Sequence, residues 1–195
     1  MKAGTVANGT GKLRIIGGKW RGRKLSVPVS PQLRPTPDRA RETLFNWLQP
    51  VITGACCLDL FAGTGVLGFE ALSRGAARVV MVESNAHLVK LLHEQRRKLG
   101  TDSAEIMCAS ALEWLQSNSD CFNIVFLDPP FRESLLETIC AALVKGEHLQ
   151  PGALVYMESE PGPTSGAGDF KVIKQSRAGQ VQYRLVEYTR GNSNK

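Results

Sequence analysis

Two short stretches of the sequence combine residue types that bind ligands or support catalysis. The first, residues 58–65, reads LDLFAGTG and closes an apolar run that predicts a strand over residues 56–61. Gly63 and Gly65 let the backbone approach a ligand closely, and the helix expected after them presents free amide groups at its N-terminus. Asp59 adds a negative charge that can hold a cationic group. This combination predicts a nucleotide-binding turn.

The residues that follow favour a ligand that contains a ribose. Residues 63–68 read GTGVLG and satisfy the dinucleotide-binding pattern. Glu83 ends the apolar run 79–82, at about the distance expected of a ribose-binding acid. A tight turn whose glycines serve only packing is the alternative interpretation, but the order of strand, turn, helix and distant acid favours a cofactor site.

The second stretch comprises Asp128, Pro129, Pro130 and Phe131. It follows an apolar run over residues 122–127, so it too is expected at the carboxyl edge of a parallel sheet, where open α/β folds bind ligands. A turn in which Asp128 caps the next helix is the alternative. The two stretches together are far more specific than either alone.

The pair of stretches resembles class I S-adenosylmethionine-dependent enzymes. Residues 128–131 look like their amino-methyltransferase motif, and residues 58–65 look like their cofactor loop. The resemblance implies methyl transfer to an exocyclic amine of a nucleobase. No Cys lies beside the prolines, which argues against carbon-5 pyrimidine methylation through a thiolate nucleophile.

The chemistry of such an amine suggests catalytic roles for the second stretch. Because the lone pair of the amine is delocalised into the ring, hydrogen-bond acceptors on its N–H groups help it toward the tetrahedral geometry of attack. The Asp128 carboxylate and the Pro129 carbonyl are the expected acceptors. Phe131 is expected to stack on the base, which must be unstacked or flipped out to reach the methyl donor.

The same resemblance implies how S-adenosylmethionine would be held. Asp59 is expected to receive its amino group, directly or through water, and Glu83 its ribose hydroxyls. Ser110 is expected near the adenine amine, although many related enzymes carry Asp or Asn there, and Ala111 is an alternative contact through its backbone. The full expected set is Asp59, Phe61, Gly63, Gly65, Glu83, Ser84, Ser110 and Ala111.

Composition limits the kind of protein that this chain can be. With 195 residues and 43% hydrophobic content, it suits one well-filled domain with a small appendage. No apolar run approaches a membrane span and the N-terminus lacks the apolar core of a signal peptide, so we expect a cytoplasmic protein. The five cysteines are odd in number and show no C-x-x-C pair, which favours buried, reduced thiols and no metal site.

Positive charge is concentrated near the N-terminus. Residues 1–41 hold ten Lys or Arg residues against one acid, a balance of +9 in a chain whose net charge is +6. This arm is expected to dock a polyanion, although a solvated basic tail is the alternative. Apolar and basic residues alternate around glycines over residues 14–27, which predicts an ordered hairpin. The expected RNA-contacting residues are Arg14, Lys19, Arg21, Arg23, Arg34 and Arg39.

Strand and helix patterns alternate along the rest of the chain. A helix is predicted with Thr36 as its cap, Pro37 in its first position and Pro50 at its end. Strands are predicted at residues 56–61, 78–82, 104–108, 122–127, 153–158, 170–176 and 182–188, the last two as an antiparallel hairpin. Later helices are predicted from about residue 66 and at residues 86–99, 111–116 and 134–144. The alternation predicts an α/β fold, a Rossmann-like, mostly parallel seven-stranded sheet with helices on both faces.

Five segments together resemble the RsmD family of 16S ribosomal RNA guanine-N2 methyltransferases. They are residues 14–25, 33–45, 58–65, 128–131 and 179–184. The resemblance implies methyl transfer from S-adenosylmethionine to N2 of guanine 966, in the customary count, of 16S rRNA in an assembled or partly assembled small ribosomal subunit. A monomer is expected, with a docking arm over residues 1–35, a catalytic domain over 36–190 and a disordered tail over 191–195.

Three other functions compete with this interpretation. An adenine-N6 methyltransferase acting on DNA or RNA would use the same residues 128–131, although a DNA enzyme is expected to carry an added recognition domain. A nicotinamide-dependent oxidoreductase fits residues 63–68 and Glu83 but leaves the basic arm without a purpose. A non-catalytic RNA-binding module fits the arm but needs no glycine loop.

Overall fold

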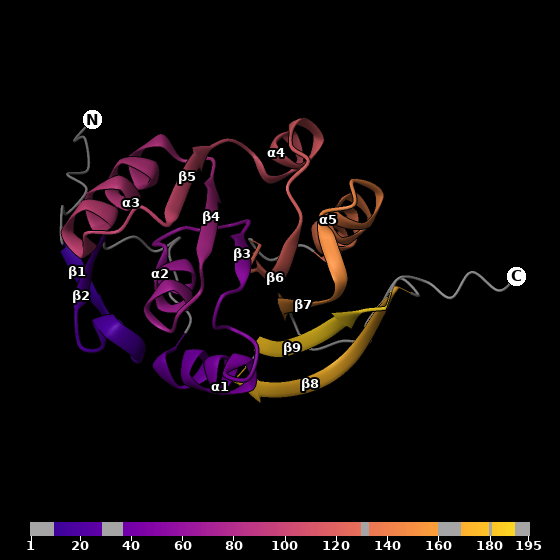
Figure 1. Ribbon diagram of the computed structural model, residues 1–195, viewed down its shortest axis with the longest axis horizontal. Coiled ribbons are helices and arrows are strands. Elements are labelled where there is room, and N and C mark those ends of the chain that lie inside the picture. The colour runs from indigo at the N-terminus through magenta and orange to yellow at the C-terminus, as the bar shows by residue number, and fades with distance from the viewer. Residues whose placement is uncertain (1–9, 29–36, 130–132, 160–168, 180, 190–195) are drawn as a thin grey trace, which may run out of the picture.

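The computed structural model describes residues 10–28, 37–129, 133–159, 169–179 and 181–189 (Figure 1). Its strands are β1 (Thr10–Arg14), β2 (Lys24–Pro28), β3 (Cys56–Asp59), β4 (Arg78–Glu83), β5 (Ala104–Cys108), β6 (Phe122–Leu127), β7 (Leu149–Ser159), β8 (Phe170–Ala178) and β9 (Val181–Tyr188). Its helices are α1 (Asp38–Leu48), α2 (Val66–Ser73), α3 (Ala86–Leu99), α4 (Ala111–Ser117) and α5 (Glu133–Lys145), with a 3-10 turn η1 (Gly18–Trp20).

Seven strands form one sheet in the order β5-β4-β3-β6-β7-β9-β8. The strands β3 to β7 run in parallel, and β9 joins β7 and β8 through antiparallel pairs. The predicted fold class, with its C-terminal antiparallel hairpin, is therefore confirmed. Strands β1 and β2 form the separate antiparallel hairpin that the alternating N-terminal pattern predicts.

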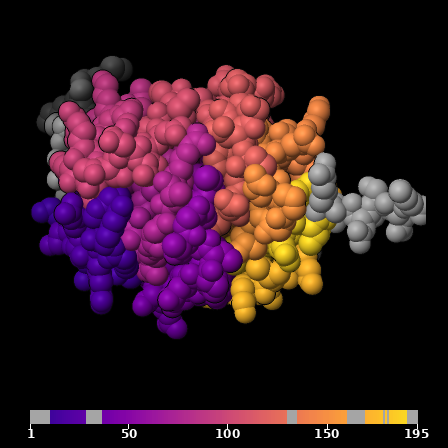
Figure 2. All heavy atoms as spheres, in the orientation of Figure 1, coloured from indigo at the N-terminus to yellow at the C-terminus, as the bar shows by residue number. Residues whose placement is uncertain are grey.

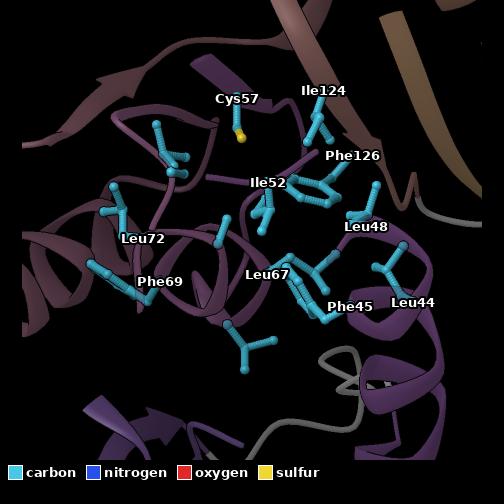
Figure 3. Close-up of a cluster of buried hydrophobic side chains, with 14 of the residues drawn as sticks. Leu44, Phe45, Leu48, Ile52, Cys57, Leu67, Phe69, Leu72, Ile124 and Phe126 are labelled. Atoms are coloured by element: carbon cyan, nitrogen blue, oxygen red, sulfur yellow. The ribbon is translucent and has the colours of Figure 1, made fainter. Parts of the chain in front are cut away.

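Apolar side chains alternate between the two faces of the sheet and give the protein two hydrophobic layers. On one face, Phe45 of α1 meets Phe126 of β6 with ring centroids 5.9 Å apart, in the cluster drawn in Figure 3. On the other face, Trp114 of α4 meets Phe122 of β6 at 6.0 Å. Along β6, Ile124 and Phe126 belong to the layer with α1, whereas Val125 and Leu127 belong to the layer with α4, so the strand supplies both, as expected of a strand buried on both sides. Phe122 precedes the register shift before Ile124 and also faces α4.

The predicted bounds of most elements lie within two residues of the observed ones, and the differences at β3, β7 and α1 have local causes. The predicted bounds of α3, β5 and β6 are confirmed. Strand β3 ends at Asp59 because the chain then turns toward β4, where the Ala62 N–H donates to the Val82 carbonyl oxygen at 2.9 Å. Strand β7 was predicted from residue 153 but begins at Leu149, because a register shift between Phe122 and Ile124 accommodates Pro151 and Gly152.

Helix α1 begins one residue later than predicted. Pro37 is its N-cap, with an extended ψ of 144°, and Asp38 is the first helical residue. The Pro37 carbonyl oxygen accepts the N–H groups of Ala40 and Arg41 at 2.9 and 3.1 Å. Thr36, the predicted cap, lies outside the described residues.

The cysteines are less buried than predicted. All five are free thiols, but only Cys57 and Cys140 are buried, whereas Cys108 is exposed. Cys108 ends β5, which is an edge strand of the sheet. Among the described residues no three His, Cys, Asp or Glu side chains gather as metal ligands would, and none of the described helices has the length and apolar character needed to cross a membrane.

Candidate functional site

The glycine loop lies where the carboxyl ends of β3, β4 and β6 meet at one edge of the sheet. Strand β3 pairs in parallel with β4 on one side and with β6 on the other. Gly65 is the N-cap of α2 with a φ of 75°, a left-handed conformation that favours glycine. A Cβ there would lie 2.4 Å from Cδ2 of Leu92, because α3 packs closely against the turn. The loop therefore places the uncapped N-terminus of α2 at this edge.

Asp59, at the end of β3, is almost fully buried, with 2% of its surface exposed. Its Oδ2 atom accepts the N–H of Gly68, in the first turns of α2, at 3.1 Å. Burial raises the pKa of Asp59 to about 7; the Gly68 hydrogen bond opposes this rise and the charge of Glu83 adds to it. A cation beside Asp59 would stabilise its ionised form, which suits the predicted contact with a ligand amino group.

Glu83 connects the glycine loop to the beginning of α3. Its Oε2 atom accepts the N–H of Gly63 at 2.8 Å and its Oε1 atom accepts the N–H of Asn85, also at 2.8 Å. The side chain is half-buried, and Ser84 beside it is exposed. The structure thus brings together Asp59, Gly63, Gly65 and Glu83 as the sequence predicts, while the ribose-binding role of Glu83 stays a prediction.

The other predicted cofactor residues Ser110, Ala111 and Phe61 have different local environments. The Ser110 hydroxyl caps α4: it accepts the N–H of Glu113 at 3.4 Å and donates to Glu113 Oε2 at 2.7 Å. Ala111 is buried as the first residue of the helix. Phe61 is partly buried and packs against the apolar cluster on the α4 side of the sheet. The local structure therefore gives Ser110 a capping role that the sequence analysis did not include.

Asp128 and Pro129 follow β6 directly at the same edge. Phe126 of β6 lies opposite Asp59 in the parallel register, so Asp128, two residues further on, comes close to the glycine loop. Burial raises the pKa of Asp128 well above its ordinary value, and the charges of Glu158 and Asp59 add to the effect. Pro129 is buried. Phe131 lies outside the described residues, so its stacking role stays a prediction.

Sequence reasoning missed Glu158, which belongs to the same neighbourhood. Met157 pairs with Leu127, so Glu158 extends β7 beside Asp128. Glu158 is 7% exposed, and its Oε1 atom accepts the hydroxyl proton of Tyr156 at 2.9 Å. An acid directly after an apolar run was the signal that identified Glu83, and the same signal was present at Glu158.

The outer face of the β1–β2 hairpin is basic. Lys12, Arg14 and Lys24 are exposed, and Arg14 lies directly opposite Lys24 across the antiparallel pair. Like charges directly opposite each other destabilise a hairpin, and an anionic partner would relieve that cost. The other predicted RNA contacts Lys19, Arg21, Arg23 and Arg39 are exposed as well, and Arg34 lies outside the described residues.

Buried polar side chains hold this hairpin against α2, and the sequence analysis missed them. Glu70 is fully buried, and its carboxylate accepts the N–H groups of Ile16 and Gly17 at 2.7 and 2.8 Å and the Nε of Arg74 at 2.8 Å. Ser73 Oγ accepts the N–H of Trp20 at 2.9 Å. The hairpin is thereby fixed to the helix that begins at the glycine loop.

Two further helices complete this attachment. Arg41 of α1 is fully buried, donates to the Arg14 carbonyl oxygen at 3.2 Å through two nitrogens and forms an ion pair with Asp38. Gln95 of α3 donates to the Ser26 carbonyl oxygen at 3.0 Å. Its position in the first turns of a helix does not predict this burial, which arises because α1 turns the side chain inward.

Comparison with known proteins identifies the family to which this chain belongs. A family model described as conserved hypothetical protein 95 matches residues 13–187. The chain is 47% identical over 182 residues to ribosomal RNA small subunit methyltransferase D of Escherichia coli strain K12, covering 92% of each chain. The chain belongs to the RsmD family. Another RsmD relative, from Haemophilus influenzae, is 43% identical over 192 residues and covers 96% of this chain and all of its own.

Solved structures agree with the RsmD assignment. The structure of yhhF from Escherichia coli has a TM-score of 0.84 at 47% identity and covers 92% of this chain and 99% of its own. An RNA methyltransferase from Salinibacter ruber, solved in complex with S-adenosyl-L-homocysteine, has a TM-score of 0.65 at 17% identity and covers 83% of this chain and 98% of its own. The latter shows the shared fold, which is that of class I methyltransferases.

Proposed function

We propose that this RsmD-family protein transfers a methyl group from S-adenosylmethionine to the exocyclic N2 of one guanine, guanine 966, of 16S rRNA in the small ribosomal subunit. The observation that carries the proposal is the register of β3 and β6. This register brings Asp128 and Pro129 beside the glycine loop and Asp59. The basic hairpin is fixed to α2, the helix that begins at the glycine loop. The curated names of the RsmD relatives support the rRNA substrate.

The residues at this edge suit the proposed cofactor. Asp59 is a buried carboxylate that no Lys or Arg pairs with among the described residues, so the amino group of a methionyl moiety would supply the missing charge. Gly65 leaves α2 without a side-chain cap, so its first-turn amides face the loop. Glu83 offers carboxylate oxygens to ribose hydroxyls. When bound, S-adenosylmethionine supplies an electrophilic methyl group on a sulfonium.

Asp128 and Pro129 are the residues that contact the guanine. Each accepts one N–H of the exocyclic amine, Asp128 through its carboxylate and Pro129 through its carbonyl, which holds the nitrogen with its lone pair toward the methyl donor. The leaving thioether is neutral and needs no proton, so no general acid is required. The product amine loses one proton, and the raised pKa of Asp128 makes its carboxylate a better acceptor for that proton than an ordinary carboxylate.

The hairpin supplies affinity for RNA without reading its sequence. Its exposed Lys and Arg side chains suit phosphates, and contacts of that kind weaken as salt rises. A guanine exposed in a loop is a base that a protein can splay out and hold, in contrast to a base inside an A-form helix. The choice of one guanine therefore rests on the shape of the assembled subunit around it.

The experiment that tests this proposal is methyl transfer from labelled S-adenosylmethionine to small ribosomal subunits that lack the modification. Free 16S rRNA and duplex DNA serve as parallel substrates, and mass spectrometry identifies the labelled nucleoside and its position. We expect N2-methylguanosine at one site, formed on the subunits. Methyladenine would replace the base assignment with adenine-N6 chemistry, and label on none of these substrates would refute the proposal.

A further inference from the structure

The hairpin contacts a second basic segment that is distant in the sequence. The Arg23 guanidinium donates to the Lys98 carbonyl oxygen at 3.4 Å, at the C-terminal end of α3. One turn earlier on α3, Gln95 holds the Ser26 carbonyl oxygen at 3.0 Å. Figures 1 and 2 show the hairpin lying directly against α3 on the outer side of the molecule. The last turn of α3 is therefore continuous with the surface of the hairpin.

That last turn carries three consecutive cations, Arg96, Arg97 and Lys98. Arg96 is engaged locally, because it pairs with Asp102 at 2.9 Å and donates to the Thr101 carbonyl oxygen at 3.1 Å. Arg97 and Lys98 are exposed, and neither forms an ion pair within the part of the chain that the structure describes. These two side chains are thus available to a partner.

A helix C-terminus favours cations even without a ligand, so stabilisation of the end of α3 is the alternative explanation for these three cations. Here Arg96 and the incoming Arg23 already lie at the end of α3, with Arg23 on one of its last carbonyl oxygens. Two more cations in the same turn add mutual repulsion, and repulsion between exposed like charges is relieved by a polyanion. Glu94, one turn before Lys98, is the exposed acid on this part of the helix.

We propose that Arg97 and Lys98 belong to the same RNA-docking surface as the hairpin, so that the grip on RNA phosphates extends onto the last turn of α3. The inference rests on the proposed rRNA substrate and adds contacts that the sequence alone did not suggest. Because Gln95 and Arg23 join the two segments, RNA that lies along the hairpin reaches α3 without any movement of the protein.

The test compares variants that lose two positive charges at different places. The variant R97A/K98A removes the proposed contacts on α3, and R21A/K24A removes two cations of the hairpin. The matched control is K171A/K174A, since both lysines are exposed on β8, at the opposite edge of the sheet from β5. The dissociation constant for 16S rRNA fragments containing the target loop, and for small subunits, is measured at several KCl concentrations, with thermal unfolding as a folding control.

We expect R97A/K98A to weaken RNA binding about tenfold and to reduce the slope of log affinity against log salt by about 1.5, as loss of two phosphate contacts predicts. K171A/K174A should bind as the unaltered protein does. E94Q should tighten binding about twofold, a gain that no folding defect can produce.

An unchanged affinity and salt slope in R97A/K98A, with a clear loss in R21A/K24A, would overturn this inference and leave the proposed function intact. Absence of salt-dependent RNA binding by the unaltered protein would instead overturn the proposed rRNA substrate, and the inference with it.

Discussion

Buried carboxylates occur at two places in this protein, and their surroundings differ. At the junction between hairpin and α2, Glu70 is fully buried and accepts two backbone N–H groups and the Arg74 guanidinium. At the carboxyl edge of the sheet, Asp59 is nearly as buried but accepts one N–H, from Gly68, and Asp128 lies close to other acids. Glu70 and Asp59 are similarly buried, but Glu70 accepts hydrogen bonds from more donors than Asp59 does.

The difference separates a structural carboxylate from one suited to ligands. A buried charge that is fully hydrogen-bonded and paired holds its neighbours in place, and removing it leaves donors unsatisfied. A buried carboxylate with few donors has a raised pKa and gains stability when a cation or an N–H group arrives. On this comparison, Glu70 fixes where the hairpin sits, whereas the surroundings of Asp59 and Asp128 suit the contacts with cofactor and substrate that we propose.

The largest expected effect comes from Asp128. The variant D128N keeps the size of the side chain but removes the carboxylate, and we expect kcat for methyl transfer to fall about a thousandfold. Dissociation constants for S-adenosylmethionine and RNA should stay within about twofold, since neither contact depends on this charge. The exposed D102N serves as the control. If D128N transferred methyl groups at the normal rate, the negative charge of Asp128 and its capacity to take a proton would not be needed, because the amide oxygen of the variant still accepts one N–H of the amine.

Replacement of Glu70 should act on stability and RNA affinity rather than on chemistry. The variant E70Q breaks the pair with Arg74 and leaves buried donors partly unsatisfied, so urea unfolding should show a loss of about 2–4 kcal/mol. Hydrogen exchange at the Ile16 and Gly17 amides should accelerate, and RNA binding should weaken as the hairpin loosens. E42Q, on an exposed part of α1, should change stability by less than about 0.5 kcal/mol. A loss of kcat with stability and RNA affinity unchanged would contradict the assignment.

The carboxyl edge of the sheet and the junction between hairpin and α2 also differ in how well the sequence predicts them. Glycines, prolines and acids that follow apolar runs mark the ends of parallel strands, and they located the edge that holds Asp59, Glu83 and Asp128. The periodic patterns of α3, β5 and β6 also predicted their bounds. These signals are local, since each depends on residues within one strand–turn–helix unit.

Contacts between distant segments could not be predicted in this way. Nothing near Glu70 indicates that its partners are Ile16 and Gly17, more than fifty residues earlier, and Arg41 resembles any arginine in the first turns of a helix. Gly18 is a related case: its φ is 74° and a Cβ would lie 1.8 Å from the Ser73 carbonyl oxygen, so its close packing is visible only once the hairpin and α2 are placed. The cap at Ser110 is different, because the Ser-x-x-Glu spacing of Ser110 and Glu113 is a local capping-box signal that the sequence did contain.

A pH titration would sharpen the role of Asp59. Its pKa of about 7 means that the carboxylate ionises as pH rises through neutrality, so affinity for the cationic amino group of S-adenosylmethionine should rise with pH. Between pH 5.5 and 7.5 the ionised fraction grows by more than about tenfold, and the affinity should follow it. D59N keeps the acceptor for Gly68 but should bind weakly and without this dependence. Calorimetric titration of both proteins measures the difference, and parallel pH profiles for the two would show that Asp59 does not hold the amino group.

The smallest expected effect belongs to Ser110. This residue is a predicted cofactor contact and also a helix cap, so structural and ligand-binding roles must be separated at one side chain. Its hydroxyl is already engaged with Glu113 in the capping box of α4, as Glu70 is engaged with the hairpin. S110A should therefore destabilise the protein by about 1 kcal/mol through loss of the cap, and the dissociation constant for S-adenosylmethionine should rise less than about threefold. S119A, an exposed serine before β6, is the matched control and should change neither quantity. A tenfold loss of cofactor affinity at unchanged stability would place Ser110 with Asp59 among the ligand-binding groups. A side chain that only caps a helix does so equally in the free and in the cofactor-bound protein, so its loss does not change the affinity for the cofactor.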